Sequence, residues 1–228
     1  MSTPTHEQFL VWIADESEAF AATITPDALD ARVPGCPEWS LRDLAWHLGR
    51  VQRFWAGGVR VGRDVEPGEF DETTPGPRDA SELAAWMRAS TSDMLDALRT
   101  TPPETPVWTW WKGDRTVGAI ARHQVQEAAV HRWDAQSAVG TPAPLEVAIA
   151  DDGVGEFLTV HREWRGTAPV EFRATDTGSS FSAGEPPTVT VRATASDLVL
   201  LLHRRITTDE VEVEGDRGAL DKFLVDVD

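Results

Sequence analysis

The sequence predicts an α+β protein in which a four-helix bundle precedes a small domain that contains a sheet. Three observations predict this class. Apolar residues recur at helical spacing in four successive segments before residue 140. Segments 169–174 and 188–192 alternate apolar and polar residues, which is the pattern of half-buried strands. The turn residues Gly140-Thr141-Pro142 separate the two patterns, so we expect a bundle over residues 1–140 and an α+β domain over residues 141–228.

The four segments of the first part each have recognisable ends. Helix 5–23 stops before Thr25-Pro26, and a second helix begins at Ser40, with Asp43 placed to complete a capping box, and ends at Gly57-Gly58. The third helix carries its apolar residues over 83–98, and the fourth covers 116–139. Pro34-Gly35-Cys36-Pro37 is interpreted as a turn, and the acidic run 64–72 as a solvated loop. Four long helices in succession predict an antiparallel bundle.

The second part mixes helices and strands. The strands are expected at 169–174, 188–192 and 210–214, and the helices at 145–164, 196–205 with Ser196 as its cap, and 216–225. This mixture predicts a small α+β domain.

Composition excludes several classes of function. The 228 residues include 41% hydrophobic residues, enough for a sizeable core, and their formal net charge of −17 repels nucleic acid and anionic lipid. No apolar run approaches the roughly 18 residues that span a bilayer. The single cysteine, Cys36, cannot form an internal disulfide, and the first thirty residues lack the order of a signal peptide. We therefore expect a cytoplasmic protein without nucleic-acid or membrane partners, either a monomer or a homodimer.

His47 is the first residue that could carry chemistry. It lies three residues after Leu44 and four before Val51, so it projects from the apolar stripe of the second helix toward the bundle interior. A core histidine that donates to a carbonyl group or a neighbouring acid is the alternative to a metal ligand.

Glu127 and His131 on the fourth helix form the second candidate group. They are four residues apart, so both side chains lie on one face and can hold one divalent ion together with an inward His47. An ordinary i,i+4 pair on a solvated face is the alternative, and His123, one turn before Glu127, is a rival ligand. Two histidines and one carboxylate leave coordination positions open, which is typical of a catalytic metal site.

Two segments of the chain resemble the mycothiol-dependent maleylpyruvate isomerase family, whose first domain is a DinB-like metal-binding bundle. Segment 33–48 contains Pro-Glu-Trp-Ser-Leu-Arg-Asp-Leu-Ala-Trp-His-Leu, and segment 116–135 contains Glu-Ala-Ala-Val-His-Arg-Trp-Asp-Ala. The resemblance implies the same three ligands that the helical spacing indicates, His47, Glu127 and His131. It also implies that the second domain is a small α+β domain related in shape to sterol-carrier folds.

Further site residues follow from the resemblance and from aromatic content. In the family a helix of the second domain usually ends in Trp-Gly-Arg, and its arginine faces the active site. Arg205 takes that position and is expected to be catalytic, while His203-Arg204 replaces the usual Trp-Gly before it. Arg204 is a candidate for binding an anionic substrate or thiol, and a cationic helix end is the alternative for this pair. Trp110 and Trp111 are candidates for a wall that binds the cofactor, and core or loop anchors are the alternative.

The resemblance implies a thiol enzyme that uses mycothiol as cosubstrate. The expected ion is zinc, with nickel or iron as alternatives, and its role is to ionise the thiol near neutral pH. The thiolate then attacks a small electrophile such as maleylpyruvate, either as an isomerase or as an S-transferase. A non-haem iron oxygenase uses the same donor types and is a second hypothesis. A non-catalytic protein that binds a small molecule is the third.

Overall fold

The computed structural model describes residues 3–62, 76–161, 169–184 and 186–225. The acidic run 64–72 and the end of the helix predicted over 145–164 lie outside the described residues. The described residues divide into two compact units, one formed by residues 4–110 and 114–143, the other by residues from 144 onward together with Thr3 and 111–113. The predicted α+β class, with a helical bundle followed by a small sheet domain, is confirmed.

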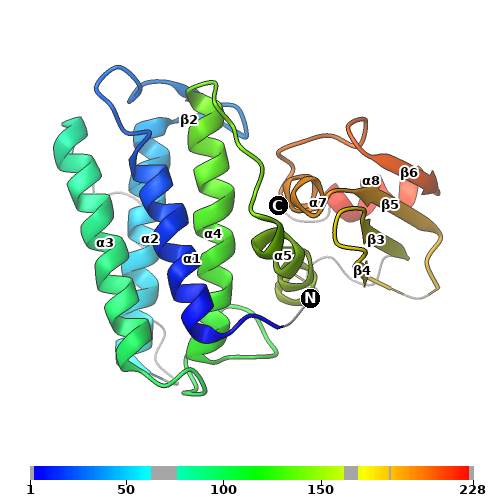
Figure 1. Ribbon diagram of the computed structural model, residues 1–228, viewed down its shortest axis with the longest axis horizontal. Coiled ribbons are helices and arrows are strands. Elements are labelled where there is room, and N and C mark those ends of the chain that lie inside the picture. The colour runs from blue at the N-terminus through cyan, green and yellow to red at the C-terminus, as the bar shows by residue number, and fades with distance from the viewer. Residues whose placement is uncertain (1–2, 63–75, 162–168, 185, 226–228) are drawn as a thin grey trace. The chain divides into compact units, whose positions relative to one another are not determined.

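In the described residues, four long helices form the N-terminal unit. Figure 1 shows them packed side by side. They are α1 (His6–Ala21), α2 (Leu41–Val61), α3 (Ala80–Thr100) and α4 (Val117–Ala138). Each begins behind a side chain that accepts from the first turn; these caps are Thr5, Ser40, Asp79 and Thr116. Such caps satisfy backbone N–H groups that the helix itself leaves without a partner.

The second helix is longer than predicted. It continues through Gly57 and Gly58 to Val61, and Gly62 caps it at φ +87° with its N–H bonded to the Gly58 carbonyl. Gly58 is buried and Val59 lies in the core, so packing in this last turn outweighs the low helix propensity of two glycines.

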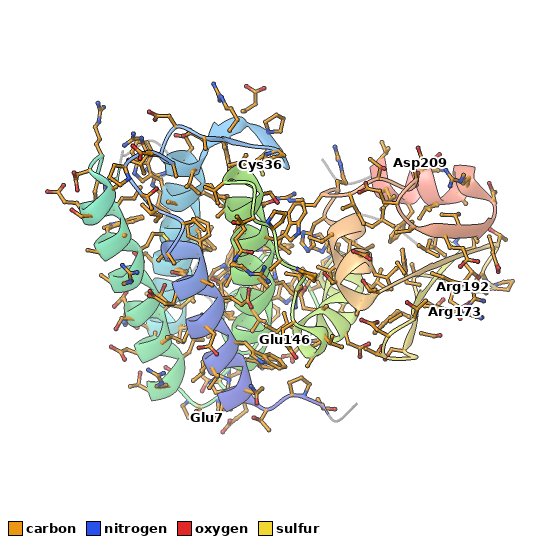
Figure 2. All side chains as sticks on the ribbon, turned by 45° about the horizontal axis from the view of Figure 1, so that its top comes forward. Glu7, Cys36, Glu146, Arg173, Arg192 and Asp209 are labelled. Atoms are coloured by element: carbon orange, nitrogen blue, oxygen red, sulfur yellow. The ribbon has the colours of Figure 1, made fainter. Side chains whose placement is uncertain are left out.

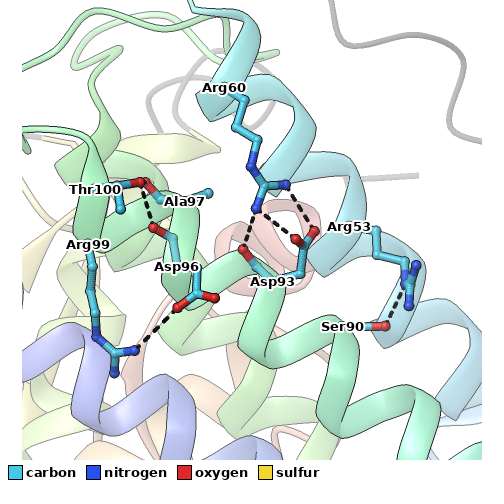
Figure 3. A network of polar contacts seen from close by, with 8 residues as sticks. All are labelled: Arg53, Arg60, Ser90, Asp93, Asp96, Ala97, Arg99 and Thr100. Atoms are coloured by element: carbon cyan, nitrogen blue, oxygen red, sulfur yellow. Dashed lines mark hydrogen bonds and ion pairs between the residues drawn. The ribbon is translucent and has the colours of Figure 1, made fainter.

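The prediction of a purely antiparallel bundle is wrong. Residue numbers rise together along α2 and α3, because Arg53 bonds Ser90 and Arg60 bonds Asp93 further along both helices (Figure 3). These two helices are therefore parallel. The connection 62–79 permits this, since 18 extended residues reach about 59 Å and a helix of 21 residues is about 31 Å long.

The α1–α3 and α2–α4 pairs are antiparallel, which leaves α1 and α4 parallel to each other. His6 of α1 bonds the Leu98 carbonyl of α3 and Glu18 pairs with Arg88, while in α2 and α4 the ring of His47 lies beside that of His131. Hence α1 and α4 run opposite to α2 and α3. Helices α1 and α2 each contact both α3 and α4. The α2–α4 contact is therefore one of the sides around the bundle.

A short hairpin precedes α2. Strand β1 (Arg32–Val33) pairs antiparallel with β2 (Cys36–Ser40), where we predicted only a turn. Val33 is fully buried in the same cluster as Leu41 and Leu44. The hairpin contacts α2 and α4, so it lies over the end of the bundle where α2 begins.

Within the part of the chain that the structure describes, the C-terminal unit contains a four-stranded sheet with helices. Its elements are α5 (Val147–Val160), β3 (Val170–Ala174), β4 (Ser180–Ser182), β5 (Val189–Ala193), α7 (Ala195–Leu202), β6 (Glu212–Gly215) and α8 (Arg217–Val225). The strand order is β4-β3-β5-β6, in which β3 and β5 are parallel and the two edge strands are antiparallel to their neighbours. The sequence analysis missed β4, whose three residues are too short for a periodic pattern.

The strands of this sheet are buried on one side only. Val170, Phe172 and Val191 are fully buried or nearly so, while Arg173 and Arg192, paired across β3 and β5, bear charge on the other side (Figure 2). The Arg173 guanidinium lies 2.8 Å from Glu171 and holds the pKa of that carboxyl below its usual value.

The predicted cap of α7 is wrong: Thr194, not Ser196, accepts from the first turn. No helix in the described ranges combines the length and apolarity that a bilayer crossing needs.

Candidate metal centre

His47 reaches the side of the bundle where α2 faces α4. The Ser40–Asp43 capping box fixes the start of α2, with the Ser40 N–H 2.9 Å from the Asp43 carboxylate. Leu44 and Leu48 on the flanking positions are fully buried, which orients this stripe inward and leaves His47 half-buried. The ring of Trp39, from β2, packs against the His47 ring with centroids 4.7 Å apart.

Glu127 and His131 meet His47 from α4. The Nε2 atom of His131 lies 3.6 Å from Oε2 of Glu127, and the His47 and His131 ring centroids are 5.2 Å apart at an interplanar angle of 84°. One potential ligand atom from each of the three residues lies within 4.8 Å of the other two. Donor atoms that bind one ion through bonds of about 2 Å lie at most about 4 Å apart, so this spread is close to what a single ion needs. Two imidazoles and a carboxylate suit zinc and other borderline divalent ions, so the donor set fits a metal.

Asp134 fixes the orientation of His131. Its side chain is fully buried, and its Oδ2 lies 3.0 Å from Nδ1 of His131. Because an ionised carboxylate only accepts hydrogen bonds, Nδ1 is the donor and Nε2 keeps its lone pair on the side of Glu127. A buried acid behind a ligating histidine is a common feature of metal sites. The sequence analysis missed Asp134, although its spacing of three residues from His131 placed it on the same face.

His123 lies on the other side of Glu127. Its Nε2 is 3.7 Å from Oε1 of Glu127, the oxygen opposite the one nearest His131. His47, Glu127 and His131 form the one group of this kind that the described residues contain, and His123 is not among them. The geometry therefore does not favour His123 as a rival ligand.

Aromatic side chains surround His123 in the N-terminal half of α4. Trp110 is 38% exposed and its ring lies 5.5 Å from that of His123, with Trp55 of α2 at 6.2 Å. An exposed indole face can contact a ligand, whereas Trp111 is 3% exposed and belongs to the other compact unit. A role for Trp110 or Trp111 in binding the cofactor stays a prediction.

Arg204 and Arg205 lie at the end of α7 in the C-terminal unit. Arg204 has φ +61°, and the N–H groups of Arg204 and Arg205 bond the carbonyls of Leu201 and Leu200, which makes this end a Schellman motif. The Arg205 guanidinium donates to the His203 carbonyl at 2.8 Å. This contact is the one expected of a cation at a helix C-terminus. A catalytic role for Arg205 and a cofactor-binding role for Arg204 stay predictions.

Comparison with known proteins identifies the family. The family described as the mycothiol maleylpyruvate isomerase N-terminal domain matches residues 12–136, more than half of the chain. The chain belongs to the mycothiol maleylpyruvate isomerase family. The matched segment of this family contains α2, α3 and α4 up to Gln136, and so it includes His47, Glu127 and His131.

Solved structures of a mycothiol-dependent maleylpyruvate isomerase share the fold. One such crystal structure is similar with a TM-score of 0.74 and 13% identity, covering 95% of this chain and 97% of that one. The structure of a histidine-to-alanine mutant of a mycothiol-dependent maleylpyruvate isomerase gives a TM-score of 0.73 and 12% identity over the same shares. No curated protein sequence matches this chain. The likeness to the isomerase structures covers both domains, whereas the family match covers the first.

Proposed function

We propose that this chain is a metal-dependent mycothiol enzyme, and that it isomerises maleylpyruvate or a related small electrophile with a cis double bond. The observation that carries the proposal is the meeting of His47, Glu127 and His131 within 4.8 Å at the α2–α4 contact. Membership of the mycothiol maleylpyruvate isomerase family supports the thiol and the substrate class. The isomerase structures with the same fold support the reaction type.

The residues divide the work as follows. His47, Glu127 and His131 would hold a divalent cation, for which zinc is our first choice, and Asp134 keeps the His131 ring turned toward it. A cation held there lowers the pKa of an incoming thiol, so that the thiolate is available near neutral pH. Trp39 packs on the His47 ring and limits its rotation, which keeps the donor of α2 aligned with those of α4.

The proposed reaction needs no oxidant or reductant. The sulfur of mycothiol forms a C–S bond to one alkene carbon, the remaining C–C single bond rotates, and the same C–S bond breaks to give the trans alkene. The thiol is thereby regenerated. An S-transferase differs only in the last step, because its C–S bond persists and the carbanion formed by the addition takes up a proton instead of expelling the thiolate. Arg205 is proposed to bind the carboxylate of the substrate, since a guanidinium matches carboxylate geometry.

Elemental analysis of the purified protein tests the site. We expect about one zinc ion per chain in the wild type and a loss of at least tenfold in His131→Ala and Glu127→Gln. His6→Ala is a matched control. His6 lies on α1 and bonds the Leu98 carbonyl of α3, so neither partner belongs to the two helices that carry the triad. Equal metal contents in the wild type and His131→Ala would contradict the proposal.

Product analysis tests the reaction. Mycothiol and maleylpyruvate are incubated with the zinc-loaded chain, and we expect the trans isomer with all mycothiol recovered. Mycothiol covalently attached to the product would indicate the transferase instead. Oxygen uptake that requires added Fe(II) and substrate would favour the oxygenase hypothesis and overturn the thiol reaction.

A further inference from the structure

Four titratable side chains alternate base and acid along one stripe of α4. They are His123, Glu127, His131 and Asp134, separated by four, four and three residues. The distances between successive partners are 3.7, 3.6 and 3.0 Å. The proposed ligands are the middle two members. Asp134 ends the series behind His131, and His123 ends it behind Glu127.

The two oxygens of Glu127 face different partners. Oε2 lies nearest His131, which belongs to the triad, and Oε1 lies 3.7 Å from Nε2 of His123, which does not. A carboxylate can bind a metal ion through one oxygen or through both. A donor held next to Oε1 favours binding through one oxygen, because a hydrogen bond to Oε1 competes with the metal for that oxygen.

His123 is well placed to hold that position. Its side chain is 8% exposed, and the rings of Trp110 and Trp55 pack edge-on against it, each at an interplanar angle of 78°. Rotation of the imidazole would require both indole rings to move. The two indole rings thus hold the His123 ring beside Glu127. A side chain can orient a metal ligand only if its own position is fixed in this way.

We propose that His123 is a positioning residue for Glu127. In the metal-bound protein its Nε2–H group, whose nitrogen lies 3.7 Å from Oε1 here, closes to hydrogen-bonding distance, keeps Glu127 a one-oxygen ligand, and leaves a coordination position free for the sulfur of the thiol. This inference rests on the proposed metal-dependent function and deepens it. In the sequence His123 was a rival for a ligand position, and the structure assigns it to the carboxylate instead.

The test compares His123→Phe with His123→Gln. Phenylalanine keeps an aromatic ring between Trp55 and Trp110 but has no donor, whereas glutamine restores an N–H donor. Zinc affinity is measured by competition with a chromophoric chelator, and the cobalt(II)-substituted proteins are compared by visible absorption, which is more intense for four ligands than for five. His161→Phe is a matched control, since His161 packs on Phe157 in the C-terminal unit.

We expect His123→Phe to bind zinc roughly 10–100-fold more weakly than the wild type, as is usual when the outer partner of a ligand is removed. Its cobalt absorption should weaken, its KM for mycothiol should rise more than its kcat falls, and His123→Gln should recover most of the zinc affinity. Near-ultraviolet circular dichroism and the melting temperature of the metal-free variants identify any loss of fold, in which case His123→Gln alone decides the comparison.

Three outcomes overturn the inference. Zinc affinity and cobalt absorption of His123→Phe that equal those of the wild type would show that His123 does not position Glu127. Complete loss of metal in both variants would make His123 a ligand. When the wild type binds zinc and Glu127→Gln does not, either of these two results refutes the role of His123 alone. The third outcome is a wild type without any zinc affinity, which refutes the proposed function as well.

Discussion

Replacing Asp134 with asparagine should weaken metal binding without leaving a cavity in the core. The two side chains have nearly the same shape, but asparagine is neutral, and its contact with Nδ1 of His131 loses the charge that makes this hydrogen bond strong. The asparagine amide can also donate to Nδ1, which would move the ring proton to Nε2 and remove the lone pair that faces Glu127. Both effects reduce the donor strength of His131.

The magnitude follows from comparable sites. Removing the outer partner of a ligating histidine usually costs 10–100-fold in metal affinity, which corresponds to about 1.4–2.7 kcal/mol at 25 °C. The fully buried position of Asp134 favours the upper half of this range, because no water replaces the lost carboxylate.

Competition titration with a chromophoric zinc chelator measures this loss. Asp15→Asn is the control, because it removes the same charge from an exposed position of α1 in a chain whose net charge is −17. The melting temperatures of the metal-free proteins show whether the fold is retained. A dissociation constant for Asp134→Asn within twofold of the control would refute the argument that Asp134 orients His131.

Three further predictions concern stability. Arg60 holds the pKa of Asp93 below its usual value of 3.8, chiefly through their hydrogen bonds (Figure 3). Asp93→Asn should therefore lower the free energy of unfolding by about 0.2–1 kcal/mol at pH 7. Urea unfolding at each pH should show this difference closing as the pH falls below 3.8 through the pKa of Asp93 in the folded chain. Neither polar atom of the buried Gln124 side chain has a hydrogen-bond partner in the described structure, so Gln124→Met should stabilise the chain by about 1–3 kcal/mol in the same assay. A methyl group on Gly49 would overlap the Trp86 ring, and the overpacking cost of about 1–3 kcal/mol should exceed the gain of ~1 kcal/mol in helix propensity, so Gly49→Ala should melt at a lower temperature.

Each of these has a contrary result. A stability difference for Asp93→Asn that persists at pH 2 would mean that the ion pair is not its source. A less stable Gln124→Met would indicate that the amide has a partner such as an ordered water. An unchanged melting temperature for Gly49→Ala would show that the Trp86 ring moves aside at little cost.

The helices were predictable because their signals are local. Ser40 caps α2 as predicted, α4 begins one residue after the predicted start at Thr116, and the apolar stripes predicted which faces are buried. The parallel arrangement of α2 and α3 was not predictable in this way, since it depends on which helices pack and on the path of a long connection. The Ser196 cap failed because Thr194 and Ser196 both fit the pattern, and only the backbone decides between them.

The candidate site was partly predictable for the same reason. Helical spacing places Glu127 and His131 on one face, and the apolar neighbours of His47 direct it inward, so each half of the site follows from its own helix. Which side chains support them depends on contacts between helices. The separate roles proposed for His123 and Asp134 therefore rest on their distances to Glu127 and His131, which the sequence does not give.

The left-handed backbone at Arg204 has a consequence for how sequences of this kind are recognised. The corner after α7 closes through main-chain hydrogen bonds from the residues at 204 and 205, and it forms here with a bulky cation at a conformation that glycine adopts most easily. The strain of roughly 1–2 kcal/mol is small enough for a folded domain to tolerate. A signature that demands glycine at this corner would therefore pass over chains that make the same turn.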